Sequence, residues 1–230
     1  MTGSIHLKQQ AADHALGYVQ SGMVVGLGTG STAILFVRRL AERLATGELR
    51  NIVGVPTSRS IEEEARKLGI PIALLEDQPL IDLTVDGADE VDPALNLIKG
   101  GGGALLREKL VAQASQREII VVDESKLSPV LGTKWHVPVE VIPFGWRSQA
   151  LFLEALGAKV IMRQKEDVPF LTDQGNLILD SHFGLIPEPA TLAAKIKARS
   201  GIVDHGLFVG LTSEVIVASA DGLRVLMHNH

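Results

Sequence analysis

Short apolar runs alternate with helical patterns along the first half of this chain, and this alternation limits the possible folds most strongly. The apolar runs, each expected to be a buried strand, are Met23–Leu27, Asn51–Val55, Ile70–Leu75, Leu80–Val85 and Glu118–Val122. Helical patterns lie between them, at about 29–45, 58–68 and 104–114. Strands that alternate with helices in this way pair in parallel, and uniformly apolar strands need helices on both faces. The sequence therefore predicts an α/β fold with a doubly wound, mostly parallel sheet.

The pattern changes after Pro129. An alternating strand at 138–143 is followed by a helix at 147–156, strands at 158–162 and 175–180, and a helix at 189–198. This order suggests a smaller α+β subdomain. Three further strands are expected at 203–209, 214–219 and 223–227, and at least one should rejoin the first sheet. We expect one domain from 1–129 plus about 206–230, and a small domain over about 130–205.

Composition excludes several classes of protein. The 230 residues fit one large domain or two small ones, and the 46% of hydrophobic residues is enough for a packed core. A net charge of −5 argues against a nucleic-acid-binding protein, and the absence of cysteine excludes disulfide and thiolate chemistry. Lys8, Asp13 and His14 interrupt any signal peptide, and no run reaches the ~18–20 apolar residues of a membrane span. A cytoplasmic protein is expected.

The most informative motif is Lys99 followed by four glycines, Gly100 to Gly103, and a helical pattern that carries Glu108. Four glycines cost backbone entropy and bury nothing, so they suit a place where the backbone must approach a ligand closely. Glycine amides at a helix start favour anions, the lysine adds a cation, and the glutamate adds a base. The run predicts a small anionic substrate that undergoes proton transfer; the alternative is a flexible surface turn before an ordinary helix.

A second glycine-rich loop follows the first predicted strand. Glycines and hydroxyl residues gather there: Gly26, Gly28, Thr29, Gly30, Ser31 and Thr32. The spacing departs from the dinucleotide fingerprint at Ser31, the second strand ends without an acid, and the P-loop spacing is absent. Loops at the carboxyl ends of parallel strands are the usual ligand crevice. We therefore expect a cradle for a phosphate or polyol; the alternative is a helix start with Ser31 or Thr32 as N-cap.

Two more polar loops follow later strands. The first, Asp86-Gly87-Ala88-Asp89-Glu90, could bind a metal, bind sugar hydroxyls or shuttle protons, or it could be a simple turn. Sugar binding is favoured over metal binding because no histidine pair or calcium-loop spacing accompanies these carboxylates. The second loop carries Lys126, which alone would read as a solvated lysine. All these loops should converge on one edge of the sheet.

Glu108 lies about one turn into its predicted helix. Because helical side chains lean toward the helix N-terminus, its carboxylate should hang back over the glycine run, where burial would raise its pKa toward that of a useful base. The alternative is an exposed glutamate balanced by Arg107 and Lys109. We assign no function to the tail His228-Asn229-His230, which is expected to be frayed.

Together these motifs resemble the ribose-5-phosphate isomerase family of type A. The resemblance runs from about Lys8 to Val225 and rests on GLGTGST (26–32), VDGADE (85–90), KGGGGALLREK (99–109), DESK (123–126) and PVEVIPF (138–144). It implies a Rossmann-like main domain, a ferredoxin-like small domain, a homodimer or homotetramer, and no metal or organic cofactor. The implied reaction interconverts ribose 5-phosphate and ribulose 5-phosphate through an enediolate, in the pentose phosphate pathway.

The resemblance also implies site residues. Glu108 corresponds to the catalytic base, Asp86 and Asp89 to a carboxylate pair at the sugar, and Lys99 and Lys126 to substrate lysines. Catalytic roles are expected for Glu108, Asp86 and Lys99. The expected substrate-binding residues are Thr29, Gly30, Ser31, Thr32, Asp86, Gly87, Ala88, Asp89, Lys99, Gly100, Gly101, Gly102 and Lys126. The resemblance also matches Lys8 to a lysine near the phosphate.

Two alternatives resemble the same fold: sugar-phosphate sensor domains of transcriptional regulators, and aminosugar-phosphate deaminases. A sensor needs no base and usually carries a DNA-binding helix-turn-helix, for which the first 22 residues are too short. A deaminase would release ammonia from an aminosugar phosphate. The glutamate over the loop favours an isomerase.

Overall fold

A computed structural model describes residues 2–228 of the chain and divides them into two compact units. Within these residues, the first unit comprises 2–88, 107–126 and 211–228, and the second comprises 89–106 and 127–210. The chain therefore leaves the first unit twice and returns to it twice. The predicted domain boundaries near residues 129 and 206 stay a prediction.

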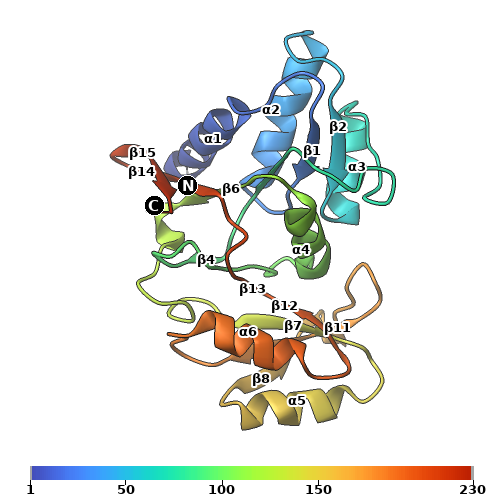
Figure 1. Ribbon diagram of the computed structural model, residues 1–230, viewed down its shortest axis with the longest axis vertical. Helices are drawn as coiled ribbons and strands as arrows, with labels where there is room; N and C mark the ends of the chain where they lie inside the picture. Colours follow the sequence, from blue (N-terminus) through green and yellow to red (C-terminus); the bar gives the residue numbers. More distant parts are fainter. Residues whose placement is uncertain (1, 229–230) are drawn as a thin grey trace. The chain divides into compact units, whose positions relative to one another are not determined.

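The first unit is built on a six-stranded sheet with the order β15-β14-β6-β3-β1-β2 (Figure 1). Its strands are β1 (Val24–Leu27), β2 (Val53–Pro56), β3 (Leu83–Asp86), β6 (Glu118–Asp123), β14 (Glu214–Ser219) and β15 (Gly222–Met227). All neighbouring strands pair in parallel except β14 and β15, which form an antiparallel hairpin. Since β14 pairs with β6, the expectation that a terminal strand rejoins the first sheet is confirmed.

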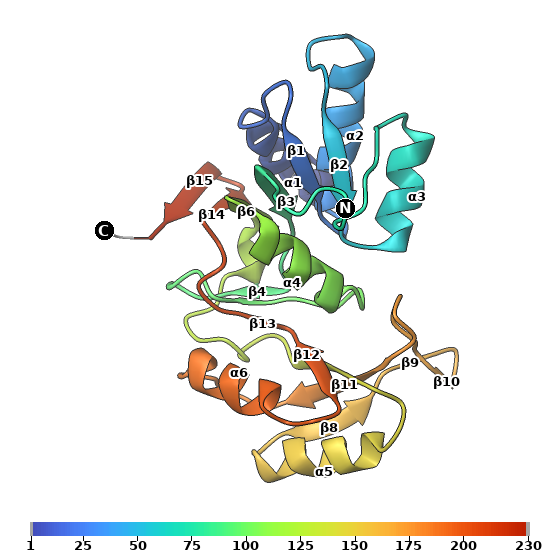
Figure 2. The same ribbon diagram turned by 45° about the vertical axis from the view of Figure 1, so that its right-hand side comes forward.

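Helices cover both faces of this sheet, as the apolar strands require. The helices are α1 (Thr2–Leu16), α2 (Ala33–Ala45), α3 (Arg59–Lys67) and α4 (Leu105–Ala114), whose first two residues belong to the second unit. The main core joins α1, α2 and α3 to one face, and α3 lies beside β2 (Figure 2). Val111 of α4 packs on the other face with Val55 and Ile81. The predicted doubly wound α/β fold is confirmed.

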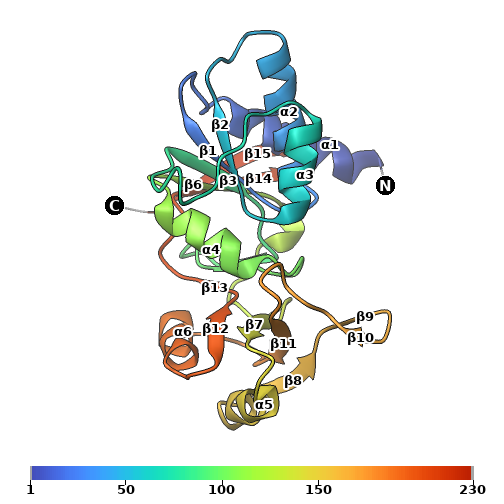
Figure 3. The ribbon, with the colours of Figure 1, turned by 90° about the vertical axis from the view of Figure 1, so that its right-hand side faces the viewer.

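The second unit contains a four-stranded antiparallel sheet with the order β12-β7-β11-β8. These strands are β7 (Val137–Val141), β8 (Lys159–Met162), β11 (Leu177–His182) and β12 (Ile202–His205). Helices α5 (Trp146–Ala155) and α6 (Pro189–Lys197) share one apolar core with this sheet (Figure 3). The core takes alternate residues of β7, namely Val137, Val139 and Val141, so the residues between them face away from the helices.

Smaller elements complete the second unit. A three-stranded sheet joins β13 (Leu207–Phe208), β5 (Leu97–Ile98) and β4 (Glu90–Val91), and β9 (Gln164–Lys165) pairs with β10 (Val168–Pro169). The short 3-10 helix η1 (Glu124–Lys126) follows β6 in the first unit. No helix within residues 2–228 is long and apolar enough to cross a membrane.

Several elements differ from the sequence expectations. The strand expected at 203–209 is divided into β12 and β13, which belong to different sheets. The predicted strand at 70–75 is only one bridge between Ile72 and Gly54, because Pro71 has no N–H with which to extend a ladder. The sequence patterns predict no element before Met23, where the structure has α1. This helix packs through the small residues Ala11, Ala12 and Ala15, which give a weak apolar signal.

Candidate functional site

Four polar loops of the first unit follow the carboxyl ends of neighbouring parallel strands. They come after β1, β2, β3 and β6, and the register places these strand ends at the same edge of the sheet. The approach is close: a Cβ added to Gly87 would lie 3.9 Å from the carbonyl oxygen of Val121 and 4.0 Å from that of Thr29. The predicted convergence on one edge therefore holds for the loops of this unit.

The carboxylate of Asp86 is held in one position at this edge of the sheet. Asp86 ends β3, its side chain is fully buried, and its Oδ1 accepts hydrogen bonds from the amides of Thr29 (2.9 Å) and Gly87 (2.7 Å). Gly28 permits this contact, because a Cβ there would lie 2.3 Å from Oδ1. A carboxylate held by two amides has one orientation, which is what a reacting or substrate-orienting group requires.

Hydroxyl groups gather beside Asp86. Thr29 Oγ1 lies 2.8 Å from Thr57 Oγ1 and donates to Ser58 Oγ at 2.8 Å. Thr57 is anchored in turn on the carbonyl of Leu27 (2.9 Å). In the sequence, the end of the second strand argues only against a dinucleotide site, because it carries no acid. The signal that Thr57 and Ser58 belong to this cluster was their position at a neighbouring parallel strand end.

The loop before α2 carries the other predicted hydroxyls. Thr32 stands at the N-cap position of α2 but makes no side-chain capping bond, while Gly30 has a φ of 121° and Ser31 is exposed. The Oγ of Ser31 accepts a hydrogen bond from Lys8 Nζ at 2.9 Å. An ammonium group, a hydroxyl and backbone amides thus lie together, which suits a phosphate.

Glu108 and Lys126 also belong to the first unit. Glu108 lies in the first turn of α4 and is 5% exposed, which excludes the alternative of a solvated glutamate. Lys126 is half-buried at the end of η1.

Asp89 and the glycine run belong to the second unit. Asp89 Oδ2 accepts a hydrogen bond from the amide of Gly101 at 2.7 Å, and a Cβ on Gly101 would lie 2.8 Å from Asp89 Oδ1. Lys99 is 1% exposed, and its Nζ lies 5.5 Å from the ring centre of Phe208. The run is an ordered loop with positive φ at Gly100 and Gly103, so the alternative of a flexible surface turn is excluded.

Glu90, the third carboxylate of its motif, has a structural role. It is fully buried and accepts hydrogen bonds from the amides of Gly132 (2.9 Å), Lys134 (3.0 Å) and Trp135 (3.1 Å). These partners lie more than forty residues further along the chain, so the sequence motif gave no sign of them. The adjacent carboxylates therefore have separate tasks.

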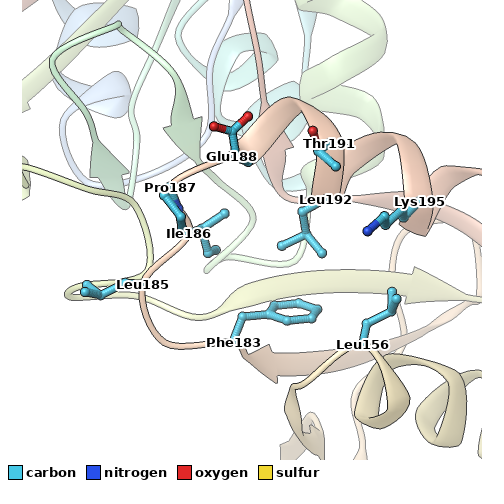
Figure 4. A pocket seen from close by; sticks show the side chains of 9 residues that line it. All are labelled: Leu156, Phe183, Leu185, Ile186, Pro187, Glu188, Thr191, Leu192 and Lys195. Carbon is cyan, nitrogen blue, oxygen red and sulfur yellow. The ribbon is translucent and has the colours of Figure 1, made fainter.

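Two other kinds of site, a metal site and a separate cavity, can be judged by their residues. Residues 2–228 contain no group of three or more histidine and acidic residues that could hold a metal ion. A cavity of about 240 Å³ lies beside α6 in the second unit (Figure 4). Its walls include Phe183, Ile186 and Leu192, and it contains none of the predicted site residues.

A parallel sheet whose carboxyl-end loops carry a locked carboxylate and clustered hydroxyls defines an α/β enzyme acting on a small polar substrate. The sequence profile of ribose 5-phosphate isomerase A (phosphoriboisomerase A) matches residues 53–222. The chain is 56% identical to ribose-5-phosphate isomerase A of Chloroflexus aurantiacus, over 94% of this chain and 91% of that one. It therefore belongs to the ribose 5-phosphate isomerase A family and is an isomerase.

Solved structures agree with this assignment. A D-ribose-5-phosphate isomerase in complex with phospho-erythronic acid superposes with a TM-score of 0.96 at 41% identity, covering 98% of this chain and 99% of that one. Ribose 5-phosphate isomerase from Plasmodium falciparum gives a TM-score of 0.94 at 41% identity, covering 98% and 100%. The sensor and deaminase alternatives are not favoured.

Proposed function

We propose that this chain interconverts ribose 5-phosphate and ribulose 5-phosphate by moving one proton between C1 and C2, with Glu108 as the base. The observation that carries this assignment is the burial of Glu108 in the first turn of α4, directly after the glycine run. In the forward direction the carboxylate takes the proton from C2 and gives an enediolate. It then returns a proton to C1, while the hydroxyl proton passes from O2 to O1. General base catalysis of this kind contributes about 10²–10⁴ in rate.

The enediolate oxygen needs donors that are in place before the reaction. We assign this task to Lys99 and to the amides of the glycine run. The amide of Gly101 already donates to Asp89, so the amide of Gly102, whose residue is exposed, is the better donor for substrate. Gly100 contributes to the shape of the loop.

The remaining predicted residues bind and orient the substrate. Asp86, with Oδ1 held by two amides, assists opening of the furanose ring, because only the open-chain aldehyde can enolise. Asp89 orients sugar hydroxyls. The hydroxyls of Thr29–Thr32, together with Lys8 and Lys126, take the phosphate and nearby hydroxyls. Gly87 and Ala88 complete the Asp86 loop with backbone groups.

The phospho-erythronic acid bound to the similar D-ribose-5-phosphate isomerase supports this assignment. This molecule carries a phosphate and a carboxylate, and a carboxylate resembles the planar, negatively charged enediolate. We expect it to inhibit this chain competitively with ribose 5-phosphate, because a site complementary to the intermediate binds its analogues more tightly than substrate.

The deciding test is NMR of Glu108→Gln with ribose 5-phosphate in deuterated water. The wild-type chain should form ribulose 5-phosphate, with deuterium at the exchanging carbon to the extent that the base trades its proton with solvent. Glu108→Gln should fold, bind phospho-erythronic acid and lose at least about 10²-fold in kcat. The control Glu42→Gln, an exposed glutamate of α2, should behave as wild type. Near wild-type turnover by Glu108→Gln would show that Glu108 is not the base.

Three broader features are proposed from the family. We infer that the chain forms a homodimer or homotetramer and works in the cytoplasm without a metal or organic cofactor. Edge strand β15 supports self-association, since its alternate residues Leu223, Val225 and Met227 are exposed apolar side chains. Light scattering after size exclusion should give at least twice the chain mass of 24.6 kDa.

A further inference from the structure

The glycine run lies on the face of the four-stranded sheet that helices α5 and α6 do not cover. These helices cover the other face, with alternate residues of β7 and β11 in their core. On the face away from the helices, a Cβ added to Gly100 would lie 3.4 Å from Pro138, and one added to Gly103 would lie 3.6 Å from Ile178. The glycine run therefore packs directly against the four-stranded sheet.

Arg163 connects this sheet face to the run. It directly follows β8, and its side chain is 13% exposed. One terminal nitrogen of its guanidinium donates to the carbonyl oxygens of both Gly100 (2.8 Å) and Gly101 (3.0 Å). Two consecutive carbonyl groups of the run therefore point toward one cation.

Asp180 holds the other side of the guanidinium. Arg163 Nε donates to Asp180 Oδ2 at 2.9 Å, and the second terminal nitrogen donates to Oδ1, so the pair is bidentate. His136 Nε2 lies 3.0 Å from the same Oδ1. Burial alone would raise the pKa of Asp180, but His136 and Arg163 together hold it below its ordinary value. The carboxylate thus stays ionised and fixes the guanidinium.

Fixing the two carbonyls also fixes two amides. In a trans peptide the C=O and N–H of one plane point in opposite directions, and residues 2–228 contain no cis peptide. The plane of the Gly100 carbonyl carries the amide of Gly101, which donates to Asp89. The plane of the Gly101 carbonyl carries the amide of Gly102, which is therefore aimed away from Arg163.

We propose that Arg163, held by Asp180, is a positioning residue that sets the Lys99–Gly102 backbone so that the Gly102 amide is presented to the substrate oxyanion. The inference rests on the function proposed above for the glycine run. Lysine cannot replace this guanidinium, because a single ammonium cannot bind Asp180 through two nitrogens while donating to two carbonyls. Since the oxyanion contact strengthens in the transition state, loss of the guanidinium should lower kcat more than it raises KM.

The test compares Arg163→Lys with Arg199→Lys. Arg199 is a matched control in the same unit, since its guanidinium donates to Gln149 and Ser148 and does not contact the run. Arg163→Lys should lower kcat about 10- to 100-fold, with KM within about threefold. It should also move the ¹⁵N-glycine amide resonances of Gly101 and Gly102, while Arg199→Lys changes neither quantity. Added guanidinium ion should restore part of the activity of Arg163→Gly.

Three results would count against the positioning role or the function proposed for the run. An unchanged kcat in folded Arg163→Lys overturns the positioning role. An equal loss in Arg163→Lys and Arg199→Lys, without guanidinium rescue of Arg163→Gly, shows that the effect is general destabilisation and also overturns it. Lys99→Met separates the two proposals. If that variant loses turnover while Arg163→Lys keeps it, only the positioning role fails. If Lys99→Met turns over normally, the role proposed for Lys99 fails, and the result with Arg163→Lys alone decides the positioning role.

Discussion

Gly28→Ala should damage catalysis out of proportion to its effect on stability. The new Cβ would lie 2.3 Å from Asp86 Oδ1 and 2.5 Å from Asp86 Cα. Ordinary van der Waals contact begins near 3.4 Å, so the two groups must separate by about 1 Å. Because one of the clashing atoms is backbone, rotation of the Asp86 side chain alone cannot relieve the contact. Strand β3 must move with its carboxylate.

The expected size follows from this displacement. Overpacking of this kind costs about 1–3 kcal/mol, or roughly 2–12 °C in Tm for a chain of this length. A 1 Å misplacement of a catalytic group costs about 10²-fold in rate, which is about 2.7 kcal/mol of transition-state stabilisation. We therefore expect kcat for ribose 5-phosphate to fall about 100-fold in a protein that is still folded at 25 °C.

The matched control is Gly54→Ala on the neighbouring strand β2. Its Cβ would lie 2.6 Å from Leu27 Cδ1, a flexible side-chain end in the core. Calorimetry and a coupled isomerase assay should show a similar loss of Tm in both variants, but a large loss of kcat only in Gly28→Ala. If the kcat of Gly28→Ala differed from that of Gly54→Ala by less than about threefold, the position of Asp86 would not matter to the reaction. The role assigned to Asp86 would then be wrong.

Three further predictions concern charged side chains. Glu90→Ala should lower the free energy of unfolding by at least about 3 kcal/mol, since it leaves three amides without their acceptor; urea unfolding measures this, and a loss below about 1 kcal/mol would contradict it. Burial raises the pKa of Glu140, so folding favours its protonated form and the wild-type chain gains stability as the pH falls. Glu140→Gln should therefore stabilise the chain near pH 7, with an advantage that shrinks as the pH falls through the raised pKa of Glu140 toward about 4.3 and changes no further below it; a pH-independent difference in unfolding would refute this. Lys8→Met should raise KM for ribose 5-phosphate several-fold with kcat nearly unchanged, because a phosphate contact binds substrate and transition state alike; steady-state kinetics would count against it if kcat fell instead.

The sequence predicted the sheet and the polar loops well, because both depend on local patterns. Apolar runs and helical spacing are properties of adjacent residues, and the loops after β1, β3 and β6 follow from parallel pairing. Gly28 and Gly101 belong to glycine-rich patterns in the sequence, and the structure supplies the reason: each admits a carboxylate that a Cβ would displace.

What the sequence could not predict depends on long-range partners. Glu90 reads like its neighbours Asp86 and Asp89 until its three amide donors at 132–135 are known. Arg163 stands in no motif, and its partners at 100, 101 and 180 are distant along the chain. Such residues become visible only when the tertiary structure brings their partners together.

The path of the chain between its two units has a consequence for modularity. Neither unit is a continuous stretch of sequence, because the second is supplied by 89–106 and 127–210. A gene fragment for residues 130–205 would lack the whole three-stranded sheet of β13, β5 and β4, and also the glycine run that rests on the small sheet. Recombination at a single junction therefore cannot exchange this unit for another.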